Sequence, residues 1–180
     1  VERHPLDVTD PGSIARLAAT LAGRPIDLLV NNAGIFGQRD ARLAALDWSA
    51  FERVLATNTL GPARVLEALL GNLRAGSRRT VVTVSSVMGS IARTEVAGAV
   101  PYRTSKAAVN MAMRSIAREL APEGFTVVVV HPGWVRTDMG GPGAAIDVET
   151  SVRGLVALID RLQPADSGRF FDYTGTELPW

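Results

Sequence analysis

The sequence contains no cysteine and very little histidine. None of the 180 residues is a cysteine, and the two histidines are His4 and His131. A disulfide framework and a thiolate metal site are therefore excluded, and two imidazoles alone make a poor ligand set. We expect no metal centre. A chain without cysteine suits a reducing compartment, and cytoplasmic is the location that we expect.

Excess charge of one sign and long apolar runs are also missing. The formal net charge is +1, from 19 basic and 18 acidic residues. No basic stripe is present that could displace counterions from a nucleic acid backbone. The apolar run at residues 125–130 is far shorter than the roughly 20 residues that span a bilayer, and residues 1–5 do not resemble a signal peptide. We therefore expect neither a nucleic acid partner nor a membrane partner.

The size and composition are those of an ordinary globular protein. Hydrophobic residues make up 47% of the chain and charged residues 21%, which predicts one domain over residues 1–180. The first residue is Val1 rather than methionine, and residue 7 already lies in an internal motif. We therefore expect a partial copy of a longer domain, either a fragment or a processed chain.

Short valine-rich runs alternate with longer segments of helical periodicity. The runs have the length and β-branched content of strands that are buried on both faces, and they lie at residues 26–30, 80–84 and 125–130. The predicted helices lie at residues 13–21, 48–73, 102–120 and 148–162, the second bent near Gly61 and Pro62. This alternation predicts an α/β fold with a Rossmann-like, doubly wound parallel sheet and helices on both faces. The glycine-rich residues 140–143 predict a mobile loop that could close over a ligand.

Polar residues follow each predicted strand. They lie at residues 31–34, at Ser85 and Ser86, and at residues 131–133. Each cluster alone is ordinary, because serine, asparagine and glycine are common in the loops that follow strands. In open α/β sheets, however, ligands bind beyond the carboxyl ends of the strands. Three clusters in succession therefore favour a site at that edge.

Tyr102 and Lys106 are the most informative pair. Lys106 is the only lysine, and Tyr102 is one of two tyrosines. A four-residue spacing on a helix places both side chains on one face, about one turn apart. We expect the ammonium to stabilise the phenolate and to lower the tyrosine pKa from its usual value near 10. The pair could then exchange a proton with an alcohol or carbonyl oxygen, although a surface Tyr/Lys pair is the simpler alternative.

Two further polar residues could serve the same chemistry. The hydroxyl of Ser86 could donate a hydrogen bond to the same substrate oxygen, or it could simply cap a turn. Asn58 lies in an apolar helical stretch, where an amide side chain destabilises the helix unless it has hydrogen-bond partners. We expect Asn58 to hold a backbone distortion and a water molecule.

With these motifs in order, the chain resembles the short-chain dehydrogenases/reductases over essentially its whole length. The motifs are Asn31-Asn32-Ala33-Gly34, Asn58, Ser86, Tyr102-x-x-x-Lys106 and Pro132-Gly133-Trp134-Val135-Arg136-Thr137. Residues 85–91, 102–111 and 175–180 are most similar to the branch of C-factor-like and sniffer-like carbonyl reductases. The family binds NAD or NADP and carries out reversible carbonyl reduction or alcohol oxidation by hydride transfer.

The resemblance implies a role for each matched residue. Tyr102 would be the general acid in reduction and the base in oxidation, Lys106 would lower its pKa and bind the nicotinamide ribose, Ser86 would orient the substrate oxygen, and Asn58 would hold a water in the proton relay. The remaining cofactor contacts implied are Asp7 and Val8 at the adenine, Asn31, Ala33 and Gly34 at the adenosine ribose, and Pro132, Gly133, Val135 and Thr137 at the carboxamide. The resemblance also implies a dimer or tetramer formed through the helices at residues 48–73 and 102–120.

The chain departs from the family at its beginning. The glycine-rich turn that binds the cofactor pyrophosphate is absent from the sequence, so we expect weakened dinucleotide affinity. The residue that separates NAD from NADP is absent too, and the choice between them is not readable. The family's first strand would pair beside residues 26–30, so we expect an exposed strand edge and a tendency to aggregate.

The sequence leaves the function open between two classes. The first is an NAD(P)-dependent oxidoreductase acting on a small carbonyl or alcohol substrate. The second is a catalytically inactive relative that acts as a dimerisation or signalling module. An extended-type sugar-nucleotide epimerase or dehydratase shares the Tyr/Lys pair. We expect neither, because such an enzyme needs a substrate domain and few residues follow Phe170-Phe171-Asp172 in this sequence. Six apolar residues that either line the substrate mouth or belong to the core favour a hydrophobic aldehyde or ketone: Ile91, Val96, Val100, Trp134, Met139 and Ile146.

Overall fold

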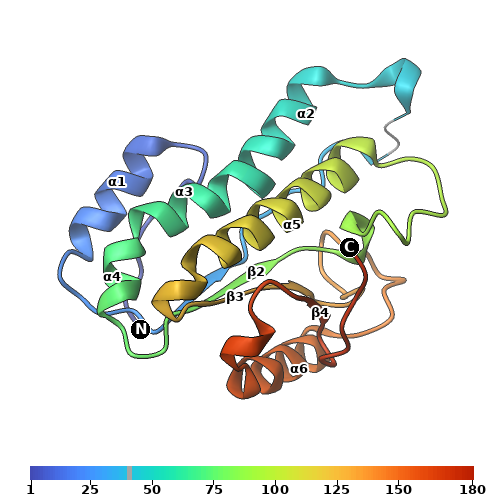
Figure 1. The fold of residues 1–180 in the computed structure, drawn as a ribbon. Coiled ribbons are helices and arrows are strands. Elements are labelled where there is room, and N and C mark those ends of the chain that lie inside the picture. The colour runs from blue at the N-terminus through green and yellow to red at the C-terminus, as the bar shows by residue number, and fades with distance from the viewer. Residues whose placement is uncertain (40–41) are drawn as a thin grey trace.

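The computed structural model describes residues 1–39 and 42–180. Parallel strands and helices alternate along the chain, as the sequence predicts (Figure 1). The α-helices are α1 (Pro11–Thr20), α2 (Trp48–Leu55), α3 (Gly61–Ala68), α4 (Leu70–Ala75), α5 (Val100–Leu120) and α6 (Val148–Arg161). Among the described residues, no helix combines the length and the apolar character needed to cross a membrane.

The strands form one parallel sheet in the order β1-β2-β3-β4. Their bounds are β1 (Leu28–Asn31), β2 (Thr80–Val84), β3 (Thr126–His131) and β4 (Phe170–Asp172). The register pairs Val82 of β2 with Val30 on one side and with Val128 on the other. The three predicted strands are confirmed with small shifts at their ends. The fourth, β4, was not predicted as a strand, because three residues are too few to show a period.

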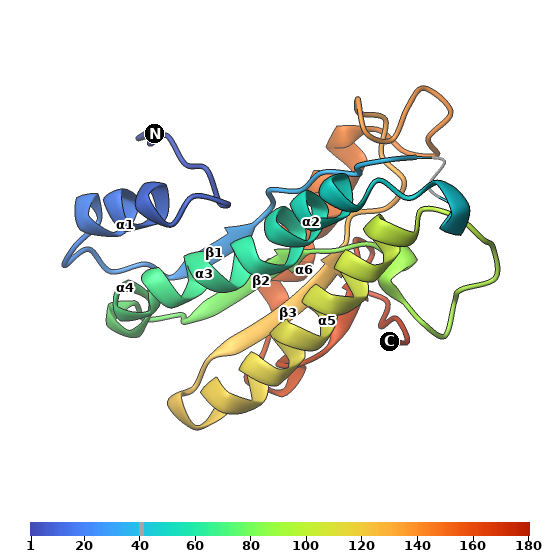
Figure 2. The same cartoon turned by 90° about the horizontal axis from the view of Figure 1, so that it is seen from above.

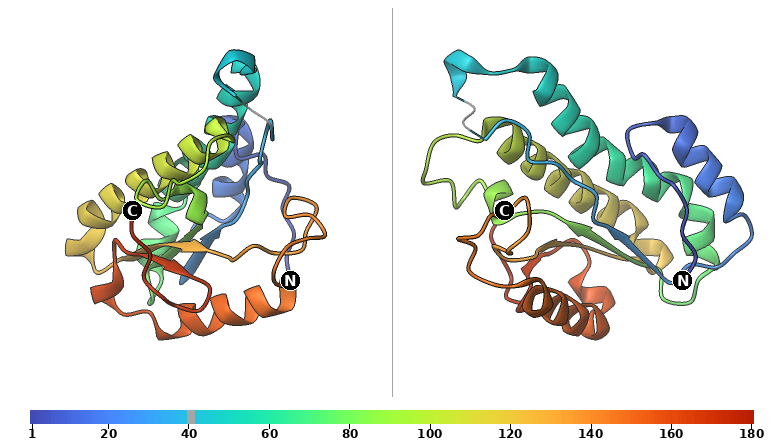
Figure 3. Two further views of the ribbon diagram at one scale, coloured as in Figure 1. Left: turned by 90° about the vertical axis from the view of Figure 1, so that its right-hand side faces the viewer. Right: turned by 180° about the vertical axis from the view of Figure 1, so that it is seen from behind.

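The sheet is buried on both faces, and consecutive residues of each strand serve opposite faces. Val81, Val127 and Val129 pack with α3 and α5 through Leu66, Val109 and Met113, among others. Val82, Val128 and Val130 pack on the other face against Leu158 of α6. The side view in Figure 3 shows α6 across the sheet from α5. The predicted doubly wound α/β architecture is confirmed.

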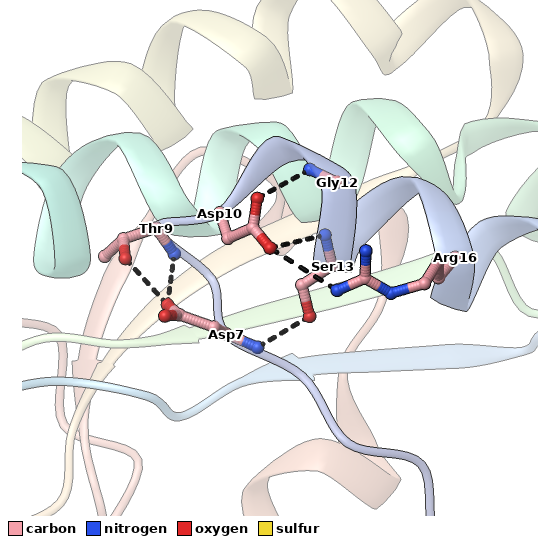
Figure 4. Close-up of polar contacts among 6 residues, drawn as sticks. All are labelled: Asp7, Thr9, Asp10, Gly12, Ser13 and Arg16. Carbon is pink, nitrogen blue, oxygen red and sulfur yellow. Dashed lines mark hydrogen bonds and ion pairs between the residues drawn. The ribbon is translucent and has the colours of Figure 1, made fainter.

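A capped turn starts α1. The Asp10 carboxylate accepts hydrogen bonds from the backbone N–H groups of Gly12 (2.8 Å) and Ser13 (3.0 Å) (Figure 4). Pro11 occupies the first helical position, where its missing N–H is no loss and its fixed φ suits the helix. The start predicted from Asp10 and Pro11 is therefore confirmed, although α1 begins two residues before the predicted segment.

The helical region at residues 48–75 is divided. Between α2 and α3, residues Ala56–Leu60 form one π-helical turn, η2, and α3 begins at Gly61 followed by Pro62. Proline lacks an N–H and displaces the carbonyl one turn earlier, so a wider turn before Pro62 relieves the clash. The predicted bend is confirmed, and its form is a π turn that contains Asn58.

β1 lies at the edge of the sheet, on the side where Figure 2 shows the N-terminus and α1. Val30 is 45% exposed, whereas its neighbour in the register, Val82, is 1% exposed. A hollow of about 230 Å³ separates β1 from Leu6, Val8 and Leu17, with α3 at its base. The predicted exposed edge is confirmed: a short apolar strand offers unpaired N–H and C=O groups to solvent.

This edge predicts self-association of the 180-residue chain. We expect Val30→Lys to lower the apparent mass at micromolar concentrations, because an edge lysine disfavours strand pairing between copies. Light scattering after size-exclusion chromatography measures the mass. Val156→Lys is the matched control, since Val156 on α6 is similarly exposed at 50% but lies away from the edge. Equal masses for the parent chain and both variants would contradict the prediction.

Candidate active site

The carboxyl ends of β1, β2 and β3 meet at one edge of the sheet, because the three strands are parallel neighbours. Asn31, at the end of β1, is buried, and its side-chain amide donates to Thr83 Oγ1 on β2 (3.3 Å). The same amide lies 3.5 Å from the carbonyl oxygen of Pro62 at the start of α3. Asn31 therefore joins β1 to β2 and to the helical layer above them.

Tyr102 and Lys106 lie in the first two turns of α5 and are both buried, at 7% and 4% exposure. The ammonium of Lys106 donates to the carbonyl oxygen of Val84, at the end of β2 (3.0 Å), and lies 5.7 Å from the centre of the Tyr102 ring. The predicted proximity of the two side chains is therefore found. Burial lowers the pKa of Lys106 to about 8, so this amine can exchange its proton close to neutral pH.

The pKa of Tyr102 moves in the direction opposite to our expectation. Burial raises it above its ordinary value of 10.0, and hydrogen bonding with the Ser86 hydroxyl only partly opposes the rise. The expectation considered the ammonium alone, but the phenol and the ammonium are both withdrawn from water, which disfavours the charged form of each. A buried phenol with a raised pKa stays protonated at neutral pH and can act as a proton donor.

Ser86 follows β2 and starts the short helix η3 (Val87–Gly89). Its Oγ accepts a hydrogen bond from the backbone N–H of Met88 (3.1 Å), so Ser86 does cap a turn. The hydroxyl hydrogen is still free to be donated, and the same side chain affects the pKa of Tyr102. The cap fixes Ser86 beside the phenol, and the two interpretations of this residue are compatible.

Asn58 is 1% exposed and lies inside the π turn. Its Oδ1 accepts from the N–H of Ile35 (2.8 Å), while its Nδ2 donates to the Ile35 carbonyl (2.8 Å) and to Ser105 Oγ (2.9 Å). Asn58 thus ties the loop after β1 to α5, and the predicted backbone distortion is confirmed. Gly34 lies against it: a Cβ there would be 3.3 Å from Asn58 Oδ1 and 3.5 Å from Lys106 Nζ.

We expect Asn58→Ala to destabilise the chain strongly. The change removes three hydrogen bonds and leaves both backbone polar groups of Ile35 without this partner, which predicts a loss of about 2–4 kcal/mol. Chemical denaturation followed by circular dichroism measures the free energy of unfolding. Asn32→Ala, at an exposed asparagine of the same loop, is the control and should change it by less than about 0.5 kcal/mol. Equal effects of the two substitutions would rule out the bridging role.

The loop after β3 folds back on itself. Gly133 has φ +87°, and a Cβ there would lie 2.5 Å from Ile146 Cδ1, so only glycine fits. Val135 pairs with Ile146 as an isolated bridge, and Thr137 Oγ1 accepts from the N–H of Gly140 (3.1 Å). The Pro132 carbonyl accepts from Ser151 Oγ (2.5 Å). These contacts give residues 132–137 a defined shape beside the strand ends.

Asp7 and Val8 lie apart from the group around Tyr102. The Asp7 carboxylate accepts from the backbone N–H (2.8 Å) and hydroxyl (2.7 Å) of Thr9, which lowers its pKa (Figure 4). Val8 lines the hollow beside β1, together with Asn31 and Ala33, and packs against Gly61. The structure therefore brings the predicted residues together in two groups, and residues 31–34 lie between them.

Two features of the site were not predicted from the sequence: the ring contact of Phe36 and the lowered pKa of His131. The Phe36 ring stacks on the Tyr102 ring with centroids 4.3 Å apart, yet nothing in a single loop phenylalanine predicts such a contact. His131 is largely withdrawn from water, which lowers its pKa to about 4. Its Nδ1 has no hydrogen-bond partner among the described residues. Its position after a buried strand was visible in the sequence, but its neutral state was not.

Comparison with known proteins shows which family the chain matches. Residues 2–145 match the family model described as short chain dehydrogenase. The chain is 51% identical over 163 residues to the protein named C-signal from Myxococcus xanthus, covering 91% of this chain and 98% of that protein.

Two solved structures share the fold and the sequence pattern. The carbonyl reductase Sniffer of D. melanogaster superposes with a TM-score of 0.91 at 34% identity, covering 97% of this chain and 76% of that one. The NADPH-bound carbonyl reductase from chicken fatty liver also gives a TM-score of 0.91 at 34% identity, covering 98% of this chain and 76% of that one.

Proposed function

The chain belongs to the short-chain dehydrogenase family, and we propose that it is an NAD(P)-dependent oxidoreductase that interconverts a small carbonyl compound and its alcohol. The observation that carries the proposal is the convergence of Tyr102, Lys106 and Ser86 at the carboxyl edge of the sheet. Such an edge is where open α/β sheets bind their ligands.

The protein groups handle the proton. In reduction, the Tyr102 hydroxyl gives its proton to the carbonyl oxygen, while the Ser86 hydroxyl donates a hydrogen bond to the same oxygen and stabilises its growing negative charge. Lys106, with a pKa of about 8, can return a proton to the tyrosine. Asn58 holds the loop and α5 in place and is the proposed anchor for a relay water. In oxidation the same groups act in reverse.

The cofactor supplies or accepts the hydride when it is bound. Two features fit a nucleotide: a cradle at Gly34, where a Cβ would press on Asn58 and Lys106, and a buried ammonium with donors to spare beyond its bond to Val84. Lys106 and Tyr102 would then hold the nicotinamide ribose. The other proposed contacts are Asp7 and Val8 at the adenine, Asn31, Ala33 and Gly34 at the adenosine ribose, and Pro132, Gly133, Val135 and Thr137 at the carboxamide.

An apolar aldehyde or ketone is the proposed substrate class. Of the six apolar residues assigned to the mouth or the core, five are exposed at the surface: Ile91, Val96, Val100, Trp134 and Met139. Exposed apolar side chains are available to contact a ligand, whereas core residues are not. A charged substrate would gain little from such a lining.

Titration with NADPH and with NADH, followed by cofactor oxidation in the presence of apolar aldehydes and ketones, tests the proposal. We expect saturable binding of at least one cofactor and oxidation that depends on the carbonyl compound. The same assay with stereospecifically deuterated cofactor shows whether the pro-R or the pro-S hydride is transferred. Saturable binding without any turnover, or no binding at millimolar cofactor, would count against an enzyme.

The second candidate function is a non-catalytic signalling or dimerisation module. The observation that favours it is the 51% identity to a protein named C-signal, of which this chain covers 98%. A module of this kind would associate as a dimer or tetramer, for which the faces of α2, α3 and α5 are the proposed surfaces. A module would still associate with its partner when Tyr102 is replaced. Carbonyl-dependent cofactor oxidation would exclude a purely non-catalytic role.

A further inference from the structure

The loop segment that carries Phe36 is fixed on both sides. Asn58 binds both backbone polar groups of Ile35, each at 2.8 Å. Gly37 has φ +74°, and a Cβ there would lie 2.5 Å from Cγ2 of Val54 on α2. The backbone at residue 37 is therefore pressed onto α2 in a conformation that favours glycine. The direction in which Phe36 projects is set by its two neighbours.

Phe36 covers one face of the phenol ring. The rings of Phe36 and Tyr102 stack with centroids 4.3 Å apart and an interplanar angle of 17°. On the outer side, the guanidinium carbon of Arg39 lies 4.9 Å from the Phe36 centroid. The Arg39 side chain donates to the carbonyl oxygen of Met139 (2.7 Å) and lies 3.5 Å from that of Asp138. The stack thus reaches from α5 to the loop after β3.

We propose that Phe36 is a positioning residue for the Tyr102 phenol, and that Arg39 couples this stack to the loop at residues 134–146. A phenol must be aimed to within a fraction of an ångström to transfer a proton efficiently. The flat contact with Phe36 fixes the plane of the ring and closes one face to water and substrate. The substrate must then approach the hydroxyl from the side of Ser86.

The inference rests on the proposed function for its catalytic meaning, but the ring contact can be measured without any activity. The chain has two tyrosines, Tyr102 and Tyr173. In a Tyr173→Phe background, the near-ultraviolet absorbance of tyrosinate reports the titration of Tyr102 alone. Within residues 1–39 and 42–180, the charged groups recorded against these two rings are Lys106, over the Tyr102 ring, and Arg39, over the Phe36 ring. Ser86 contributes an uncharged hydroxyl from the end of β2.

Phe36→Ala should lower the pKa of Tyr102 in this titration, because water gains access to the ring face that Phe36 covers. The matched control is Phe51→Ala, since Phe51 is also half-buried and its ring stacks on Trp48 (centroids 6.0 Å apart) rather than on Tyr102. An unchanged Tyr102 titration in a folded Phe36→Ala chain overturns the proposal. If that variant loses its cooperative unfolding transition, Phe36→Leu, which keeps most of the volume without the ring, takes its place.

In a chain that shows carbonyl reduction, Phe36→Ala should lower kcat by about ten- to a hundredfold with KM changed by less than about threefold, because ring orientation rather than ground-state binding is lost. Phe36→Tyr should restore kcat. The effects of Arg39→Met and Phe36→Ala on kcat should be non-additive when the two substitutions are combined, as expected for groups in one stack. A kcat loss that Phe36→Tyr does not restore, or additive effects, would refute the positioning role. Absence of turnover in every form would refute the proposed enzyme function but leave the titration to decide this inference.

Discussion

Tyr102→Phe is expected to lower kcat/KM for carbonyl reduction by about 10²–10⁴-fold, the contribution typical of a positioned general acid. The substitution removes one oxygen and leaves the ring, so the stack with Phe36 and the packing of α5 should persist. Steady-state kinetics with the best carbonyl substrate measure the loss, and cofactor binding should change far less than turnover.

Tyr173→Phe is the matched control, because it removes a hydroxyl from the only other tyrosine. Its kcat/KM should stay within about twofold of the parent chain, because no proposed step uses this hydroxyl and the substitution keeps the ring that lies against Gly133. Equal kcat/KM for Tyr102→Phe and the parent chain would remove the phenol from the reaction.

Lys106→Met is expected to change activity and stability in opposite directions. Turnover should fall by about 10²-fold or more, since the amine is the proposed proton source for Tyr102. The free energy of unfolding at pH 7 should rise, because a 4% exposed ammonium with one carbonyl partner is replaced by an apolar side chain of similar length. Lys106 is thus expected to lower the free energy of unfolding of the folded chain.

The pH dependence of stability identifies the cause. Lys106 has a pKa of about 8 in the folded chain against an ordinary value of 10.5. Below pH 8 both states hold the proton, and the folded state bears the full penalty. Between pH 8 and 10.5 the unfolded chain binds more protons, so the free energy of unfolding should rise with pH, by about 3 kcal/mol in all.

Denaturation curves between pH 7 and pH 10 measure this slope, below the range in which Tyr102 contributes with the opposite sign. The slope should disappear in Lys106→Met and remain in Arg118→Met, which removes an exposed positive charge from the same helix. A slope that survives in Lys106→Met would assign the proton to another group.

Much of the fold could be predicted from local patterns. Valine runs and apolar periodicity placed three strands and the helical segments, because each is long enough to show its period. β4 was not predicted because its three residues, Phe170–Asp172, adopt the strand conformation through pairing with β3 rather than through a pattern in their own sequence. The open edge of β1 could be predicted because strand order follows from the family pattern.

The proximity of Tyr102 and Lys106 could be predicted from the sequence, but the electrostatics of the pair could not. The spacing of Tyr102 and Lys106 and the isolated polarity of Asn58 were visible in the sequence. The direction of the Tyr102 pKa was not, because it depends on how deeply both groups are buried in three dimensions. Phe36 was invisible for a similar reason: its contact with Tyr102 joins residues 66 positions apart and follows from the clamp on Ile35 and Gly37.

The π turn sets the rotational phase of the helical layer. Five buried residues recur at intervals of four along α2, η2 and α3: Ala50, Val54, Asn58, Pro62 and Leu66. In a regular α-helix each such step drifts by about 40°, so Ala50 and Leu66 would face about 160° apart. The extra residue in the π turn reduces this angular separation by about 100°. Deleting one residue from 56–60 would therefore convert the π turn into a regular α-helical turn and rotate the buried face of either α2 or α3 away from the sheet. This segment should be intolerant of changes in length, whereas its exposed positions can vary in sequence.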